Sequence, residues 1–202
     1  MAHCPRPSTH FGDTASPATS PLQAQPPTEV LPRLYIGDLA AAECPETLAA
    51  LGITHVLSVM PGHVAIPPPA TLSHLARPLE RLQLPLHDTP FAELALHLPR
   101  TTAWIEHALR ADPANRVLVH CVQGVSRSAS VVAAYLVAET RWPPKYVVEW
   151  IQAKRPCAQP NSGFVAQLDE YARSLAIALP AAPAGAQGRQ HPHAYSHAHR
   201  QA

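Results

Sequence analysis

Apolar residues follow two different spacings along this chain, and the change between them predicts where strands and helices lie. Short apolar runs bounded by turn residues predict strands at Arg33 to Gly37, Thr54 to Val59, Gln83 to Asp88 and Val117 to His120. A further short strand is expected near Leu75 to Pro78. Prolines between the second and third of the four main strands predict an irregular connection there.

Apolar residues three and four positions apart predict helices in the intervals. A short helix is expected at Glu46 to Leu51, where Gly52 suits the position that ends a helix. Phe91, Leu94, Leu98, Ile105 and Leu109 recur at helical spacing, and Pro99 is expected to start a second helix within this stretch rather than lie in the middle of one. The three remaining helices carry the apolar sets Val131, Val132, Tyr135 and Leu136, then Val147, Val148 and Ile151, then Phe164, Leu168, Tyr171 and Leu175.

The order of these elements predicts the fold class. Strands alternate with helices and are followed by helices alone, which is typical of an α/β fold with a central, mostly parallel sheet flanked by helices. Within the 202 residues, positions 1–28 are rich in Pro, Ser, Thr and Ala, and positions 179–202 in Ala, Pro, Gly, Gln and His. Both segments are expected to be disordered tails around one domain at 29–178.

The stretch His120-Cys121-Val122-Gln123-Gly124-Val125-Ser126-Arg127-Ser128 joins a predicted strand to a predicted helix. A loop in that position turns its backbone N–H groups toward one point at the helix N-terminus, which favours an anion. Gly124 lets the loop turn tightly, and the planar guanidinium of Arg127 matches two phosphate oxygens. The sequence therefore predicts a phosphate cradle from Val122 to Arg127. Cys121 would lie at its floor as a thiolate nucleophile.

Cleavage of a phosphate ester also needs a proton for the leaving oxygen. Asp88, at the end of a predicted strand, is the expected donor, and it would later take a proton from the attacking water. The Ser128 hydroxyl can donate to the Cys121 sulfur and help the thiolate leave. Glu93 is a rival acid, but a place on a solvated helix face is favoured for it, as a surface position is for His87. An Asp before Thr-Pro also fits a turn.

These residues resemble the cysteine-dependent protein tyrosine phosphatase superfamily, specifically its small dual-specificity branch. The resemblance covers about residues 29 to 176. Glu29 to Gly37 resembles the family's opening strand, Leu51 to Val59 its next helix end and strand, and Lys154-Arg155-Pro156 with Pro160-Asn161-Ser162-Gly163-Phe164 its C-terminal signature.

This resemblance implies a role for each matched residue. Cys121 is the nucleophile, Arg127 binds phosphate and Asp88 is the general acid. Ser128 aids hydrolysis, and Asn161 hydrogen-bonds to the loop and holds its shape, a role compatible with capping a helix. His120 is expected to orient the loop through hydrogen bonds to backbone groups rather than act as a base.

The implied function is that of a metal-independent phosphatase that hydrolyses phosphotyrosine and also phosphoserine and phosphothreonine in phosphoproteins. Phosphorylated protein kinases are candidate substrates. The interior of the loop holds no Lys or Arg, which disfavours a phosphoinositide substrate. Three alternatives remain open: a non-catalytic phosphate-binding module, an RNA 5′-phosphatase and a phosphoinositide phosphatase of the same superfamily.

Composition narrows the partners. The net charge of +1 does not indicate binding to nucleic acid or to acidic membranes. The sequence predicts no particular oligomeric state. No secretory signal or apolar run of membrane-spanning length is evident, so the cytoplasm or nucleus is expected. The four cysteines form no zinc or disulfide pattern, and no metal or cofactor is expected. Cys44 and Cys157 could form a disulfide with Cys121 when it oxidises, but inert thiols are favoured. The C-terminal tail is expected to bind no metal of biological consequence through its four histidines: His191, His193, His197 and His199.

Overall fold

The computed structural model describes residues 25–72 and 78–176. A five-stranded sheet runs through the middle of the fold in the order β1-β2-β5-β3-β4. Its strands are β1 (Thr28–Leu31), β2 (Leu34–Gly37), β3 (His55–Val59), β4 (Glu80–Leu84) and β5 (Val117–His120). Only β1 runs antiparallel to its neighbour, β2, and the other pairs are parallel. The expected α/β class with a mostly parallel central sheet is therefore confirmed.

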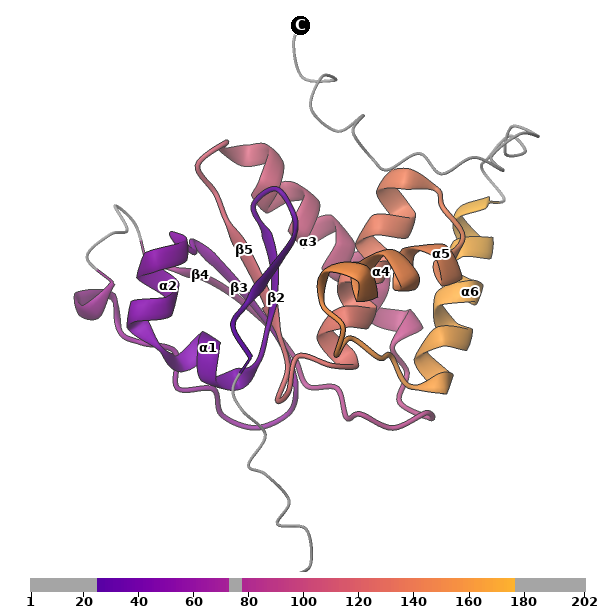
Figure 1. Cartoon of the computed structure of the whole chain (residues 1–202), viewed down its shortest axis with the longest axis horizontal. Coiled ribbons are helices and arrows are strands. Elements are labelled where there is room, and N and C mark those ends of the chain that lie inside the picture. Colours follow the sequence, from indigo (N-terminus) through magenta and orange to yellow (C-terminus); the bar gives the residue numbers. More distant parts are fainter. Residues whose placement is uncertain (1–24, 73–77, 177–202) are drawn as a thin grey trace, which may run out of the picture.

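Helices cover both faces of this sheet, as Figure 1 shows. The short helices α1 (Leu39–Glu43) and α2 (Pro45–Leu51) lie on one face. The longer helices pack together on the other: α3 (Leu98–Ala111), α4 (Arg127–Thr140), α5 (Pro144–Lys154) and α6 (Ser162–Ala176). Two 3-10 turns, η1 (Pro69–Thr71) and η2 (Ala95–His97), lie in the connections.

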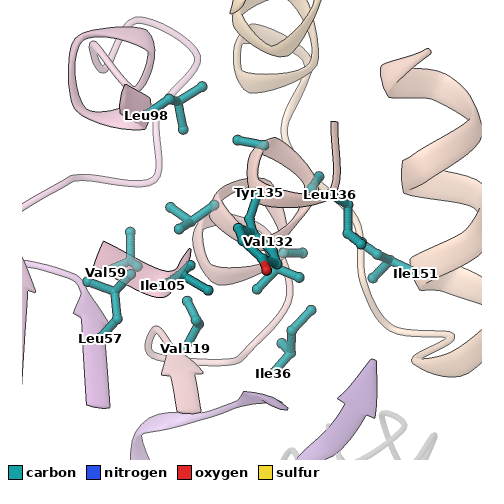
Figure 2. Packing of buried hydrophobic residues seen from close by; sticks show 14 of the residues in the cluster. Ile36, Leu57, Val59, Leu98, Ile105, Val119, Val132, Tyr135, Leu136 and Ile151 are labelled. Carbon is teal, nitrogen blue, oxygen red and sulfur yellow. The ribbon is translucent and has the colours of Figure 1, made fainter. Parts of the chain in front are cut away.

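Alternation along the strands divides the core between the two faces. Successive strand residues point to opposite sides of a sheet. On β5, Val117 and Val119 join the large cluster under α3, α4, α5 and α6, whereas Leu118 joins the smaller cluster under α2. Figure 2 shows Val119 beside Ile105, with Val132 of α4 above the sheet. Buried apolar side chains on both faces thus hold β5 rigidly at the centre.

Two strand predictions need correction. The strand expected at Gln83 to Asp88 is observed at Glu80–Leu84, because Pro85 has no N–H to continue the ladder. The single opening strand is instead a hairpin of β1 and β2, broken where Arg33 adopts a left-handed φ of 69°. Thr28, expected to end the N-terminal tail, is the first residue of β1. Of the strand expected near Leu75, residues 75–77 lie outside the described residues. Residues 1–24 and 177–202, where the expected tails lie, are outside them as well.

The helix predictions hold except before α3, where a turn at residues 89–92 and the 3-10 turn η2 replace the α-helix expected to precede Pro99. Pro99 lies in the first turn of α3, as expected. Leu94, Leu98 and Ile105 are fully buried, but Phe91 is 93% exposed and takes no part in the core. Helix α1 was not predicted; Asp38 caps it by accepting a hydrogen bond from the Ala41 N–H at 2.8 Å.

Parallel pairing brings the carboxyl ends of four strands to one edge of the sheet. Gly37, Val59 and His120 end β2, β3 and β5 there, and β5 lies between the other two. Loops at this edge are the usual ligand-binding region of open α/β sheets. No helix within residues 25–72 and 78–176 is both long and apolar enough to cross a membrane.

Candidate active site

The loop from Cys121 to Ser126 connects β5 directly to α4 at the carboxyl edge of the sheet. Gly124 has a φ of +67°, the left-handed conformation that glycine adopts without strain. A Cβ added there would lie 2.6 Å from Arg155 Nη2 and 2.5 Å from the Gly37 carbonyl oxygen. Both the backbone angle and the close packing therefore require glycine, and the resulting turn forms the cradle.

The Cys121 sulfur lies at the floor of this cradle. The residue is 1% exposed, and its Sγ accepts a hydrogen bond from the Gly124 N–H at 3.3 Å. The Ser128 hydroxyl, in the first turn of α4, lies 3.3 Å from the same sulfur. A backbone donor and a hydroxyl thus point at Cys121, which suits a sulfur that carries negative charge.

Arg127 is the first residue of α4 and is buried, at 9% exposure. Its Nη1 donates to the Leu86 carbonyl at 3.3 Å. Leu86 belongs to the connection of residues 85–94 between β4 and η2, which carries Asp88 and is called the Asp88 loop below. Its Nε lies 3.4 Å from Asp88 Oδ2, close enough for an ion pair but not aligned for a hydrogen bond. The guanidinium is held between the cradle and the Asp88 loop, where two phosphate oxygens can bind to it.

The Asp88 carboxylate lies at the mouth of the cradle, with its side chain about one-third exposed. Its Oδ1 accepts hydrogen bonds from the Ser126 hydroxyl at 2.7 Å and from Asn161 Nδ2 at 2.8 Å. Asp88 therefore contacts the cradle on one side and the start of α6 on the other. Residues separated by up to 73 positions in sequence meet at this one oxygen.

Asn161 links three parts of the site. Its backbone N–H donates to the Ser126 hydroxyl at 3.1 Å, and its side-chain amide donates to Asp88. Its Oδ1 accepts from the Phe164 N–H at 3.0 Å, which caps α6. The capping and bracing roles considered for this residue occur together.

His120 lies beneath the loop and is fully buried. Its Nε2 is 2.7 Å from the Ser58 hydroxyl, and its Nδ1 is 3.3 Å from the Cys121 carbonyl oxygen. Burial lowers the pKa of the imidazole to about 4, against the weaker opposing effects of the Cys121 carbonyl and of Glu43 and Asp38. At neutral pH the ring is uncharged and holds the root of the loop through its two nitrogens.

Comparison with known proteins identifies the family. The family model described as "Dual specificity phosphatase, catalytic domain" matches residues 34–174. The chain belongs to the dual specificity phosphatase family. It is 39% identical to mouse dual specificity protein phosphatase 13B over 140 residues, 69% of each chain. As a member of this family, the chain is a cysteine-based protein phosphatase.

Further relatives agree with this assignment. Human dual specificity phosphatase 28 is 35% identical over 161 residues, which are 80% of this chain and 83% of that one. Its crystal structure matches with a TM-score of 0.64 over 75% of this chain and 95% of that one, at 34% identity. A mouse putative dual specificity phosphatase complexed with zinc tungstate matches with a TM-score of 0.67 at 32% identity, over 85% and 96%. Other relatives are longer: the chain spans 57% of mouse dual specificity protein phosphatase 15.

Arg155 is a residue of this phosphatase whose part in the site the sequence interpretation missed. It is 1% exposed, and its Nε donates to the Gly124 carbonyl at 2.9 Å. Its Nη1 donates to the Pro26 carbonyl and the Thr28 hydroxyl, both at 3.0 Å. Burial of a guanidinium is costly unless it is hydrogen-bonded, and these three hydrogen bonds offset part of that cost. Here they fasten β1 to the back of the cradle, and the only signal in the sequence was an arginine before Pro156.

Backbone hydrogen bonds tie the remaining cradle residues to other segments of the chain. Val122 is 44% exposed, and its carbonyl accepts from the Leu39 N–H at 3.2 Å. Gln123 is exposed and Val125 half-buried, and the Val125 carbonyl accepts from the Gln159 N–H.

The structure also places the residues considered as a rival acid, as surface groups, as further thiols and as metal ligands. Glu93 and His87 are exposed. Cys44 donates to Glu46 at 3.2 Å, and Cys44, Cys121 and Cys157 are free thiols. Among the described residues, no group of three or more His, Cys, Asp or Glu side chains is arranged to hold a metal ion. The four tail histidines lie outside the described residues.

Proposed function

We propose that this chain hydrolyses phosphate monoesters on proteins, with Cys121 as the nucleophile and Asp88 as the general acid. The observation that carries the proposal is one convergence of groups. The Cys121 sulfur accepts from Gly124 and lies beside Ser128, while Asp88 is hydrogen-bonded to Ser126 at the mouth of the same loop. The candidate nucleophile, loop N–H donor and proton donor thus belong to one loop and to a carboxylate hydrogen-bonded to it, as a phosphatase site requires.

The first step transfers the phosphoryl group to sulfur. The Cys121 thiolate forms an S–P bond while the P–O bond to the substrate breaks. Asp88, as the carboxylic acid, gives its proton to the leaving oxygen. Arg127 and the loop N–H groups bind the phosphoryl oxygens as charge redistributes on them. A phosphoryl group competes with Asp88 for the Arg127 guanidinium, which frees the carboxyl group for proton transfer.

The second step returns the enzyme to its starting state. Water attacks phosphorus, the Asp88 carboxylate takes the proton of that water, and the S–P bond breaks. The Ser128 hydroxyl, 3.3 Å from sulfur, donates to the departing thiolate. Inorganic phosphate leaves, and the scheme requires no metal ion or cofactor.

The substrate is a phosphoprotein, and we propose phosphotyrosine together with phosphoserine and phosphothreonine. The relatives are named dual specificity phosphatases, which supports this range. The related mouse structure is complexed with zinc tungstate, and tungstate is a tetrahedral oxyanion of phosphate-like shape, which supports oxyanion binding by such a protein. Residues 122–126 carry no cation that could meet the extra phosphates of an inositide. A reducing compartment, the cytoplasm or nucleus, suits the reactive thiol.

Two single substitutions test the assignment of roles. With 4-nitrophenyl phosphate and phosphopeptides in the presence of EDTA, Cys121→Ser should lower kcat by at least about a thousandfold. Cys44→Ser, at a half-buried thiol that contacts Glu46, is the matched control and should retain wild-type kcat. Asp88→Asn should lower kcat by about a hundredfold with little change in KM.

The outcomes separate the proposal from its rivals. Phosphopeptide binding by the wild-type chain without turnover of any ester would indicate a non-catalytic module. Faster hydrolysis of an RNA 5′-phosphate or a phosphoinositide than of phosphopeptides would change the substrate class. Substrates themselves can be captured with the Asp88→Ala, Cys121→Ser double variant and identified by mass spectrometry.

A further inference from the structure

Phe91 is an exposed aromatic side chain beside the site that neither the core nor the reaction scheme uses. It is 93% exposed, three residues after Asp88. Scattered exposed apolar residues are ordinary on protein surfaces and mean little by themselves. The position of Phe91 and the way its backbone is held distinguish it.

Phe91 occupies the corner of a tight turn. The Ala92 N–H donates to the Thr89 carbonyl at 3.1 Å, so Pro90 and Phe91 are the two central residues of the turn. Proline suits the first of these positions because its ring fixes φ. The turn sets the direction in which the Phe91 side chain leaves the backbone.

Helix α6 holds this turn in place from the other side. Gly163 lies so close to the Pro90 carbonyl that no Cβ would fit between them. The Gln167 side chain donates to the Ala92 carbonyl at 2.9 Å and accepts from the Ala95 N–H at 2.8 Å. With the Asn161 bond to Asp88, these contacts fix the backbone on both sides of Phe91. A side chain carried on a backbone held in this way costs less conformational entropy on binding than one carried on a mobile loop, because the backbone is already ordered.

The cradle loop itself is also uncharged between Val122 and Ser126 and partly apolar where it is exposed. Val122 is 44% exposed on the side of α1, where its carbonyl meets Leu39. No Lys or Arg lies among residues 122–126, and Glu93 is the only charged residue from Thr89 to His97 when histidine is neutral. A substrate segment lying against residues 122–126 and 89–97 would therefore meet apolar groups and no Lys or Arg side chain of these two stretches.

We propose that Phe91 determines substrate specificity by binding an aliphatic or aromatic side chain that flanks the phosphorylated residue. This inference rests on the proposed function and adds the sequence context of its substrate. Phe91 is three residues after Asp88, so its backbone lies at most about 10 Å from the backbone of the proposed acid. An extended substrate covers the same distance in about three residues, so the preferred apolar residue lies within about three positions of the phosphorylated one. Acidic flanks, which need cations at the rim, are not preferred.

Kinetics with matched phosphopeptides test this inference. Phosphotyrosine peptides with a neutral Ser/Ala/Gly background carry a single Leu, or a single Glu, at each position from −3 to +3. Each kcat/KM is divided by the same enzyme's kcat/KM for 4-nitrophenyl phosphate, so a general change in catalysis cancels. For the wild-type chain, Leu at one or two positions should raise this ratio about tenfold through KM, and Glu should not.

Variants at position 91 then test whether the Phe91 side chain causes the preference for Leu. Phe91→Ser should reduce the Leu preference to less than twofold, and Phe91→Leu should restore most of it. Tyr146→Ser removes another exposed aromatic, at 49% exposure on α5, and should leave the preference intact.

Failure of the inference and failure of the proposed function look different. Equal Leu preference in wild type and Phe91→Ser, or no Leu preference in wild type, overturns the role of Phe91 while phosphopeptide hydrolysis stands. Hydrolysis of 4-nitrophenyl phosphate without hydrolysis of any phosphopeptide overturns the phosphoprotein substrate, and this inference with it.

Discussion

The cradle and the Asp88 loop lie against each other, yet they are held in place in different ways. The cradle is seven residues long from Cys121 to Arg127, and its shape follows from a strand, a left-handed glycine and a helix start in direct succession. The Asp88 loop has no such local frame, and distant residues in and just before α6 hold it: Asn161, which caps the helix, with Gly163 and Gln167. The shape of the cradle is thus set mainly by neighbours in sequence, with Arg155 as a distant brace, whereas the position of the Asp88 loop is set by neighbours in space.

This difference implies that the two halves can be broken separately. Damage to the cradle should remove phosphate binding and thiol reactivity together. Damage to the contacts of α6 should remove proton donation and leave the thiol reactive. Alkylation of Cys121 with iodoacetamide reports the first half, and turnover of esters with poor leaving groups reports the second.

The largest effect is expected from Gly124→Ala. The added methyl meets the Gly37 carbonyl and Arg155 while forcing alanine into a φ of +67°, so the cradle cannot keep its shape. We expect kcat/KM to fall by about a thousandfold or more, with slower alkylation of Cys121. Gly62→Ala is the matched control, because Gly62 also has a positive φ, +86°, but open space around it. It should lower stability by about 1 kcal/mol and leave kcat unchanged. Equal losses in both variants would contradict this account of the cradle.

Gly163→Ala should break the other half. Alanine in the first turn of a helix normally stabilises it by up to about 1 kcal/mol, but here the methyl overlaps the Pro90 carbonyl and displaces the Asp88 loop. We expect kcat for an alkyl phosphate to fall by about a hundredfold, with a smaller loss for 4-nitrophenyl phosphate, whose leaving group needs less protonation. The rate of Cys121 alkylation should stay at the wild-type value. Ser162→Ala, at the exposed neighbouring position, is the control, and a slower alkylation rate in Gly163→Ala would show that the halves are coupled.

His120 makes the foundation of the cradle sensitive to pH. Its pKa is about 4 in the folded protein and about 6.5 when unfolded, so only the unfolded chain takes up this proton as pH falls from 7 to 5. Stability from this group is therefore present at neutral pH and lost on acidification. The folding equilibrium constant should drop by about twentyfold, roughly 2 kcal/mol, over that interval. Urea unfolding at pH 7, 6 and 5 measures the drop, which His120→Asn should reduce; parallel curves for the two proteins would rule out the imidazole as its source.

The smallest effect is expected from Asn161→Ser. Serine keeps an oxygen that can cap α6 at the Phe164 N–H but loses the amide that donates to Asp88. We expect kcat to fall about fivefold with stability nearly unchanged, since Ser126 and Arg127 still contact Asp88. Asn161→Ala removes the cap as well and should lower stability by about 1 kcal/mol more. Urea unfolding and steady-state kinetics separate the two effects. If serine costs as much stability as alanine, capping is not what the side-chain oxygen provides.

Errors in the sequence interpretation fall where a proline or a contact between distant segments outweighs the apolar spacing. Helical spacing grouped Phe91 with Leu94 and Leu98, but Pro90 and the α6 contacts turn Phe91 outward. An alternating apolar run predicted a strand through Asp88, whereas the ladder ends at Leu84. Arg155 showed no local pattern that marks a buried brace, because its hydrogen-bond partners lie 31 and up to 129 residues away.

The sequence by itself determined the α/β fold class, the strand–loop–helix that makes the cradle, and the chemical groups available there. These depend on short-range features: apolar periodicity, a glycine with a positive φ, and residue types within one loop. Only the tertiary structure decided how far Asp88 lies from the cradle, which groups hold it, and that Phe91 stays outside the core. Those depend on how α6 packs against a loop some 70 residues earlier, and no local pattern encodes the distance between two such segments.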